Sequence, residues 1–229
     1  MQEAPKPDFF KKTEGGLTVA SADFTNHAAR YGLLIQTFVP RPIAWVLTEN
    51  PDGTHNLAPF SYAGCVDHNP PTLLFSCGMR REARDLKKDT WANLERTGKC
   101  VVHIPSVANM EAVNNSAAGL AVGESEVDEF DIPLTYFDGF DMPRVKDAPV
   151  AYGCKLKDVV ELGNVPMGLI MVEVENFYMA DHIVESIEDE NMHIDELAID
   201  PLTRLGKTKY GTLGELHDIG SPPKLVPVK

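Results

Sequence analysis

Apolar and polar positions alternate along several short segments of the chain, a pattern typical of β-strands. The clearest pair is the segment 41–48 (RPIAWVLT) and the segment 55–62 (HNLAPFSY), which are separated by the turn-forming residues 49–54. Two alternating segments joined by such a turn predict a β-hairpin. Further strands are predicted after the Pro70–Pro71 pair and at 100–104, 151–159 and 168–179.

Three segments are predicted to be helical. The first is 26–36, for which Asn26 is a suitable N-cap, and the second is 89–98, for which Asp89 could serve as the cap. The third spans 106–118. Many short strands with few helices favour a mainly β fold, a β-barrel, over alternating βαβ units.

The distribution of these elements indicates one domain with two extensions. We expect a polar N-terminal arm at residues 1–25, a barrel domain at 26–210 and a C-terminal tail at 211–229. The stretch 181–200 carries eight acidic residues and no Lys or Arg, so we interpret it as a solvated face or tail.

Composition narrows the function. The chain of 229 residues has a net charge of −13, which disfavours general binding to nucleic acid or to anionic membranes. Its first residues carry charges and prolines instead of an apolar leader, and no apolar run approaches the roughly 20 residues of a membrane span. Four dispersed cysteines suggest free thiols in a reducing compartment. We therefore expect a cytoplasmic protein.

One segment is basic against this acidic background. Residues 80–88 (RREARDLKK) hold five basic and two acidic side chains and lead directly into the predicted helix at 89–98. A helix N-terminus attracts phosphate, so Lys88, Thr90 and either Arg80 or Arg84 are candidate phosphate ligands. The alternative is a solvated loop that balances nearby acids, and charge alone does not exclude it.

The predicted hairpin contains a second irregularity. Pro59 interrupts its second strand, and a proline inside a strand indicates an edge or a bulge where backbone groups can face a ligand. Asn56 and Ser61 bring polar side chains close to this point, and Arg41–Pro42 similarly precede the first strand. An ordinary barrel rim would look the same.

Other catalytic signatures are missing from the sequence. The seven histidines lack metal-ligand spacing, so we predict no metal site. There is no G-x-S-x-G elbow, no Gly–Lys phosphate loop and no G-x-G-x-x-G motif. No residue is identified as a catalytic acid or base.

Several blocks, in this order, resemble the flavin reductase-like family. The most specific are PRPIAWV at 40–46, NLAPFS at 56–61 and KDT-x-x-N at 88–93. Weaker matches are YGLL at 31–34, NPP at 69–71, DEF at 128–130 and RLG with a later Tyr at 204–210. The resemblance covers roughly residues 31–210.

Members of this family are FMN-binding split β-barrels, so the resemblance implies an FMN cofactor, a homodimer with each flavin near the subunit boundary, and use of NAD(P)H. It places the phosphate at 88–90, the ribityl chain and ring edge along 56–61, and backbone donors for the ring along 41–48. The cofactor-binding residues it implies are Arg41, Pro42, Ile43, Trp45, Val46, Asn56, Ala58, Pro59, Phe60, Ser61, Ser76, Lys88, Asp89, Thr90 and Asn93.

One departure bears on activity. Many flavin reductases carry a G-x-H motif before a late strand, and the corresponding residues 163–168 (GNVPMG) contain no histidine. Two hypotheses follow: an FMN-dependent oxidoreductase that passes electrons from NAD(P)H to a small acceptor, or a non-catalytic flavin store or redox sensor. A structural module with an empty barrel is the third class.

Overall fold

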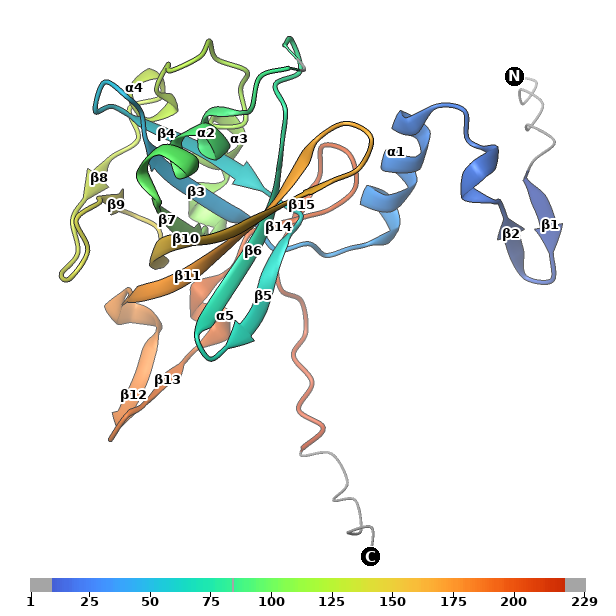
Figure 1. Ribbon diagram of the computed structural model, residues 1–229. Helices are drawn as coiled ribbons and strands as arrows, with labels where there is room; N and C mark the ends of the chain where they lie inside the picture. Colours follow the sequence, from blue (N-terminus) through green and yellow to red (C-terminus); the bar gives the residue numbers. More distant parts are fainter. Residues whose placement is uncertain (1–9, 84, 221–229) are drawn as a thin grey trace, which may run out of the picture.

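The barrel is one curled antiparallel sheet of seven strands, described here from a computed structural model that covers residues 10–83 and 85–220. Its strands lie in the order β4-β3-β7-β10-β11-β6-β5 (Figure 1). Their bounds are β3 Ala44–Glu49, β4 His55–Phe60, β5 Ala63–His68, β6 Pro71–Gly78, β7 Lys99–Ile104, β10 Val150–Leu162 and β11 Met167–Met179. The two edge strands, β4 and β5, follow one another in the chain, so the sheet closes on itself and leaves a split between them. The predicted mainly β split barrel is confirmed.

Two predicted helices form close to their expected bounds. Helix α1 (His27–Thr37) begins after Asn26, whose side chain accepts the backbone N–H of Ala28 at 2.9 Å. Helix α2 (Asp89–Thr97) ends at a glycine with φ of 71°, a left-handed conformation that favours glycine. The prediction that Asp89 caps α2 is wrong, because Lys88 occupies the cap position and Asp89 is the first helical residue.

The third predicted helix, at 106–118, is shorter than expected. A 3-10 turn at Val107–Asn109 precedes helix α3 (Met110–Asn115). The remaining described elements are β1 Lys11–Thr13, β2 Gly16–Thr18, a 3-10 turn at Ser21–Asp23, α4 Glu126–Glu129, β8 Leu134–Thr135, β9 Arg144–Val145, a 3-10 turn at Asp181–Ile183, β12 Val184–Glu188, β13 Asn191–Ile194, α5 Glu196–Ile199, β14 Thr203–Arg204 and β15 Tyr210–Gly211.

Both faces of β3 are buried, which divides the apolar core into two clusters. Inside the barrel, Val46 packs with Phe75, Ile170 and Trp91 of helix α2. On the outer face, Trp45 belongs to a cluster covered by the segment 107–148. Three of the four free cysteines (Cys77, Cys100 and Cys154) are buried in the inner cluster, and Cys65 is exposed.

His103 fastens the outer cover to the barrel. Its Nδ1 lies 2.8 Å from the carbonyl of Trp45, and its Nε2 accepts the backbone N–H of Val145 at 2.9 Å. Burial lowers the pKa of His103 to about 4, so the imidazole is neutral, with Nδ1 as the donor.

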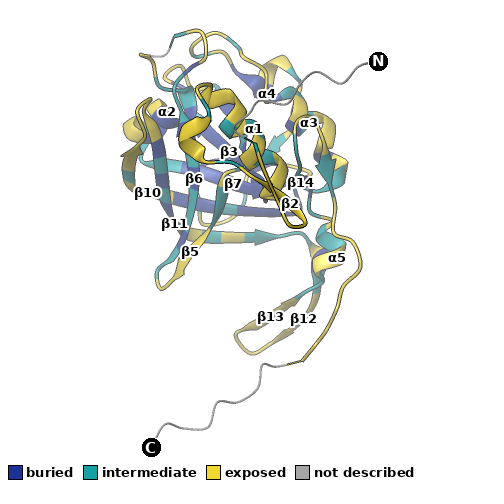
Figure 2. Cartoon of the chain, turned by 90° about the vertical axis from the view of Figure 1, so that its right-hand side faces the viewer, coloured by how far each residue is buried: buried dark blue, intermediate teal, exposed yellow. Residues whose placement is uncertain are grey.

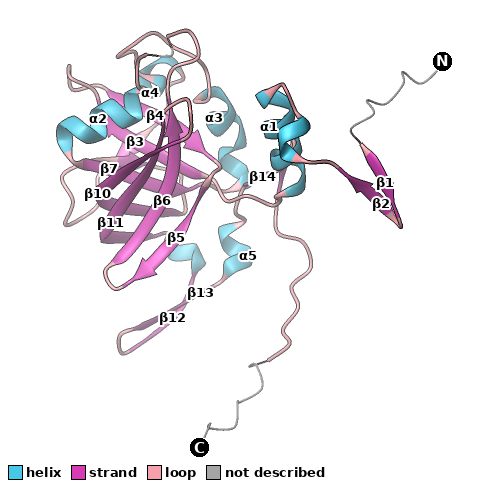
Figure 3. Ribbon diagram, turned by 45° about the vertical axis from the view of Figure 1, so that its right-hand side comes forward, coloured by secondary structure: helices cyan, strands magenta, loops and turns pink. Residues whose placement is uncertain are grey.

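Two parts of the chain project from the barrel (Figures 1 and 3). The first comprises the β1–β2 hairpin and α1, and none of residues 10–40 is buried. The second is the β12–β13 hairpin of the acidic stretch 181–200, most of which is exposed in Figure 2. Among the helices described, none has the length and apolar character required to cross a membrane.

Candidate functional site

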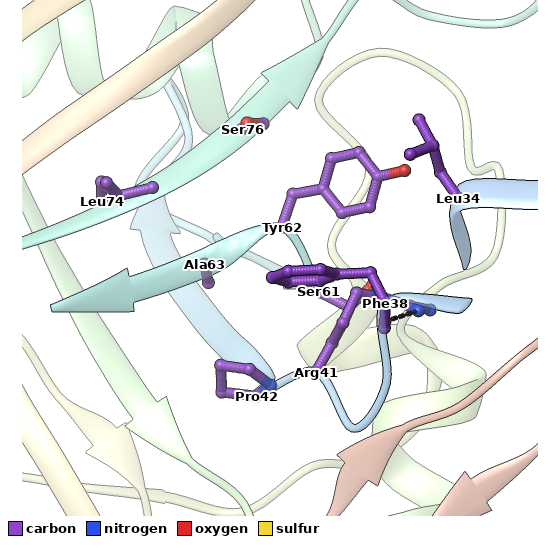
Figure 4. A pocket seen from close by; sticks show the side chains of 9 residues that line it. All are labelled: Leu34, Phe38, Arg41, Pro42, Ser61, Tyr62, Ala63, Leu74 and Ser76. Atoms are coloured by element: carbon purple, nitrogen blue, oxygen red, sulfur yellow. Dashed lines mark hydrogen bonds between the residues drawn. The ribbon is translucent and has the colours of Figure 1, made fainter. Parts of the chain in front are cut away.

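A pocket of about 320 Å³ opens at the split of the barrel, between α1 and the turn that joins β4 to β5. Figure 4 shows its lining: Leu34, Phe38, Arg41, Pro42, Ser61, Tyr62, Ala63, Leu74 and Ser76. Four of these residues, Arg41, Pro42, Ser61 and Ser76, are among the predicted cofactor residues. The structure therefore brings together side chains from three separate parts of the sequence.

The lining suits a flat apolar ring with a polar edge. Phe38, Tyr62 and Leu74 supply broad apolar surfaces, and the serine side chains of Ser61 and Ser76 supply hydroxyl groups. Pockets for aromatic ligands combine mostly apolar walls with a few polar groups that fix orientation. The pocket can hold one planar heteroaromatic ring.

Arg41 forms the polar side of the pocket and is itself only 2% exposed. Its Nη1 donates to the carbonyls of Ile35 and Phe38 at 2.7 and 2.9 Å, and its Nη2 donates to the carbonyl of Leu205 at 3.0 Å. Its Nε lies 3.4 Å from the hydroxyl of Ser61. The guanidinium thus joins the end of α1, the hairpin β14–β15 and the pocket.

Lys88 lies close to Phe60, the residue that precedes Ser61 of the pocket. The Lys88 ammonium lies 5.9 Å from the centroid of the Phe60 ring. Within residues 10–83 and 85–220, no carboxylate forms an ion pair with Lys88. As the N-cap residue of α2 it also adjoins backbone N–H groups that have no carbonyl partner in the helix. This corner can bind an anion.

Two of the other four cations of the basic segment, Arg80 and Lys87, are paired with carboxylates, whereas Arg81 is exposed. Arg80 is paired with Asp89 at 2.8 Å and also contacts Glu82 and the Leu120 carbonyl. Lys87 is paired with Glu95 at 2.6 Å. Arg84 lies outside the described residues. Arg80 and Lys87 therefore balance nearby acids, as the alternative interpretation expects, whereas Lys88 does not.

Three predicted ligands form a buried network instead of facing the pocket. Asn56 donates from Nδ2 to the hydroxyls of Thr48 and Thr90 at 3.1 and 2.9 Å. Asn93 donates to Thr48 at 3.2 Å and to the side-chain oxygen of Asn50 at 2.8 Å. Because Thr90, Asn56 and Asn93 are at most 4% exposed, their side chains hold α2 against β3 and β4. The direct contact between the Thr90 hydroxyl and a phosphate stays a prediction, and in this structure that hydroxyl accepts a hydrogen bond from Asn56.

The strand 41–48 also differs from expectation. Residues 45–47 of β3 pair with β4 on one side and β7 on the other, so their backbone donors are not available to a ligand. The side chains of Ile43, Trp45 and Val46 are at most 3% exposed and lie in the core. Their assignment as cofactor-binding residues stays a prediction. Ala58 and Pro59 are partly buried on the edge strand β4.

The sequence did not indicate several pocket residues. Leu34 lies in the predicted helix 26–36 and Phe38 follows it, while Tyr62 and Leu74 lie in predicted strands and Ala63 follows the strand 55–62. Nothing in the alternating pattern showed that α1 lies across the split. The block at 31–34 was one available signal, because Leu34 belongs to it.

Glu126 is a buried carboxylate close to the hydrogen-bond network of Asn56, Thr90 and Asn93. Its Oε2 accepts the backbone N–H of Leu57 at 3.0 Å, which caps part of the open edge of β4. The pKa of Glu126 is raised to about 7, mainly by burial and in small part by the nearby Asp89, and the hydrogen bond from Leu57 opposes this shift.

The segment 163–168 forms the turn between β10 and the start of β11. Gly163 has φ of 81°, and a Cβ on Gly168 would lie 3.0 Å from the Trp91 ring. This segment contains no histidine, and the backbone at its last residue, Gly168, lies close to the Trp91 ring of helix α2.

A family model described as "Flavin reductase like domain" matches residues 36–197, which is more than half of the chain. The chain belongs to the flavin reductase-like family. A Bacillus subtilis member, described only as uncharacterized, is 33% identical over 86% of this chain and 95% of its own. The crystal structure of nitrilotriacetate monooxygenase component B from Bacillus cereus is 28% identical, covers 90% of this chain and 100% of its own, and has a TM-score of 0.81.

A more distant structure has the same fold. The FMN-binding protein from Thermus thermophilus with bound p-hydroxybenzaldehyde has a TM-score of 0.61 at 17% identity, over 80% of this chain and 92% of its own. Flavin reductase-like proteins with a split barrel therefore extend well beyond close sequence relatives.

Arg41→Lys should release α1 from the barrel, because one ammonium group cannot reach the carbonyls of Ile35 and Leu205 together. We expect the free energy of unfolding to fall by about 2–4 kcal/mol, since buried acceptors lose their partner. Amide hydrogen exchange over residues 27–38 should accelerate. Arg81→Lys, at an exposed cation, is the control, and equal exchange in both variants would contradict the role given to Arg41.

Glu126→Gln should stabilise the protein at high pH. A raised pKa means that the folded state binds the proton more tightly than the unfolded state, so wild-type stability is lost as pH rises from about 4.5 through about 7. Relative to wild type, the variant should gain about 1–3 kcal/mol between pH 4.5 and pH 8 in urea unfolding. The exposed Glu129→Gln should show no such gain, and a variant curve parallel to wild type would refute the assignment.

Proposed function

We propose that this protein binds FMN, with the ring in the pocket at the split and the phosphate at Lys88 and the N-terminus of α2. Two observations carry this proposal: an apolar, ring-sized pocket, and Lys88, a cation without an ion-pair partner among the described residues that lies 5.9 Å from the ring of Phe60, the residue before Ser61 of the pocket. The FMN-binding protein and the flavoredoxin of Desulfovibrio vulgaris, which share the fold, support the choice of cofactor.

The residues present fit the chemical parts of FMN. The pocket offers apolar walls for the ring, and the hydroxyl groups of Ser61 and Ser76 can hydrogen-bond the polyol chain. Lys88 offers one positive charge for the phosphate. Bound FMN supplies a ring that accepts a hydride or single electrons.

The protein itself supplies position and electrostatics. Arg41 places a buried positive charge at the pocket wall, and within the described residues no carboxylate forms an ion pair with it. A fixed positive charge favours negative charge on a nearby ring, which is the change that accompanies reduction. We therefore infer an FMN-dependent oxidoreductase that takes electrons from NAD(P)H and passes them to a small acceptor in the cytoplasm.

The second candidate is a non-catalytic flavin carrier or redox sensor. The observation that favours it is the turn 163–168, which contains no histidine. Both candidates use the same pocket and differ in whether a reductant reaches the ring.

We also propose that the protein works as a homodimer in which a second copy covers the pocket. Leu34 and Phe38 line the pocket yet are 57% and 72% exposed. Apolar groups this open are typical of a surface that another chain covers, and a two-fold dimer is the simplest such assembly.

Lys88→Ala should weaken FMN binding and leave riboflavin binding unchanged, because riboflavin lacks the phosphate. Losing one hydrogen bond to a charged group should raise the FMN dissociation constant about 10- to 100-fold, as measured by flavin fluorescence titration. Lys87→Ala is the matched control, since Lys87 is already paired with Glu95. The phosphate assignment fails if FMN affinity in the Lys88 variant equals that of the control.

Anaerobic addition of NADH or NADPH to the FMN-loaded protein distinguishes the two candidates. For an oxidoreductase we expect the flavin absorbance band to bleach within seconds. If the band persists while dithionite still removes it, the protein is a flavin carrier. A purified protein that is colourless and takes up no FMN would contradict both.

A further inference from the structure

The N-terminal arm, defined here as residues 10–37, leaves its apolar side chains uncovered. It comprises the β1–β2 hairpin, the 3-10 turn at Ser21–Asp23 and helix α1, and it extends away from the barrel (Figures 1 and 3). None of its residues is buried, and Leu17, Tyr31 and Leu33 are 56%, 55% and 46% exposed. The family match begins at residue 36, so nearly all of the arm precedes the shared domain.

Such an arm is not stable by its own interactions. A helix of 11 residues is marginal in water, and a hairpin of two three-residue strands is marginal as well. The arm meets its own barrel through α1: Arg41 binds the Ile35 carbonyl, the centroid of the Tyr31 ring lies 6.5 Å from that of the Tyr62 ring, and Gln36 packs against Gly206. Its remaining apolar surface needs a partner.

We propose that each arm packs onto the barrel of a second copy of this chain, so that two arms are exchanged about a two-fold axis. This inference names the surface of the homodimer and rests on the proposed function only in that the same dimer would cover the flavin pocket. Arg41 ties the arm to the pocket wall, so a copy held by the arm also lies beside Leu34 and Phe38.

Charge favours a second copy as the occupant. The arm carries three basic side chains, Lys11, Lys12 and Arg30, against two acidic ones, whereas the whole chain has a net charge of −13. The acidic stretch 181–200 has no basic residue and is largely exposed. A weakly basic, apolar arm is therefore complementary to the surface of another copy of the same protein.

The test uses full-length protein with Leu17→Glu and Leu33→Glu together, two positions that do not line the pocket. Light scattering after size exclusion at micromolar concentration should give two copies for wild type and one for the variant, with at least a tenfold rise in the dissociation constant of the dimer. Ile187→Glu, at a 65% exposed side chain of β12, is the control and should remain dimeric. Fluorescence of the buried Trp45 and Trp91 reports whether the barrel stays folded.

A monomeric wild type, or a dimer that survives both arm substitutions, would overturn the arm proposal. If the Leu17 and Leu33 variant aggregates, Lys11→Glu with Lys12→Glu tests the same contact, and a dimer as tight as wild type would overturn it. FMN titration of wild type is read separately. A dimer that depends on the arm but binds no FMN would refute the proposed function and support the arm.

Discussion

The buried guanidinium of Arg41 is the interaction on which the pocket depends. A cation that is 2% exposed must be compensated, and here carbonyl groups compensate it. Two of these carbonyls, of Ile35 and Phe38, lie at the C-terminal end of α1, where the helix dipole is negative. The charge that costs most to bury is therefore also the group that fixes α1 across the split. Without the Arg41 guanidinium, α1 would not be held across the split, and Leu34 would not form an apolar wall of the pocket.

The basic segment shows how one charge becomes functional in an acidic protein. Five cations at 80–88 look equivalent in the sequence, but Arg80 and Lys87 have carboxylate partners in the fold. Lys88 has no such partner among the described residues; it occupies the cap position of α2, and its ammonium lies 5.9 Å from the centroid of the Phe60 ring. The buried hydrogen-bond network of Asn56, Thr90 and Asn93 holds α2 in this orientation. These residues, which were expected to touch the ligand, therefore position the helix that carries Lys88.

The sequence predicted what depends on neighbours in the chain and missed what depends on distant ones. The hairpin 41–62, the cap at Asn26 and the glycine that ends α2 are local features, and they form as expected. The pairing of β3 with β7 is long-range, so the burial of Trp45 and Val46 on both sides of the strand could not be read from alternation. Ser61 and Ser76 could be predicted as pocket residues because they lie in a motif and a predicted strand. Phe38 could not, because its place in the pocket depends on a long-range contact.

Whether the protein is an enzyme or a carrier depends on access to the pocket more than on a catalytic side chain. Electron transfer to a flavin needs stacking and position, and no described acid or base faces the ring-sized space. The turn 163–168 contains no histidine, and its last residue, Gly168, lies close to the Trp91 ring. The side of the pocket next to α1 is open in a single chain. The second copy that we propose would narrow this entrance, so the contact proposed for the arm would also set which molecules reach a bound ring.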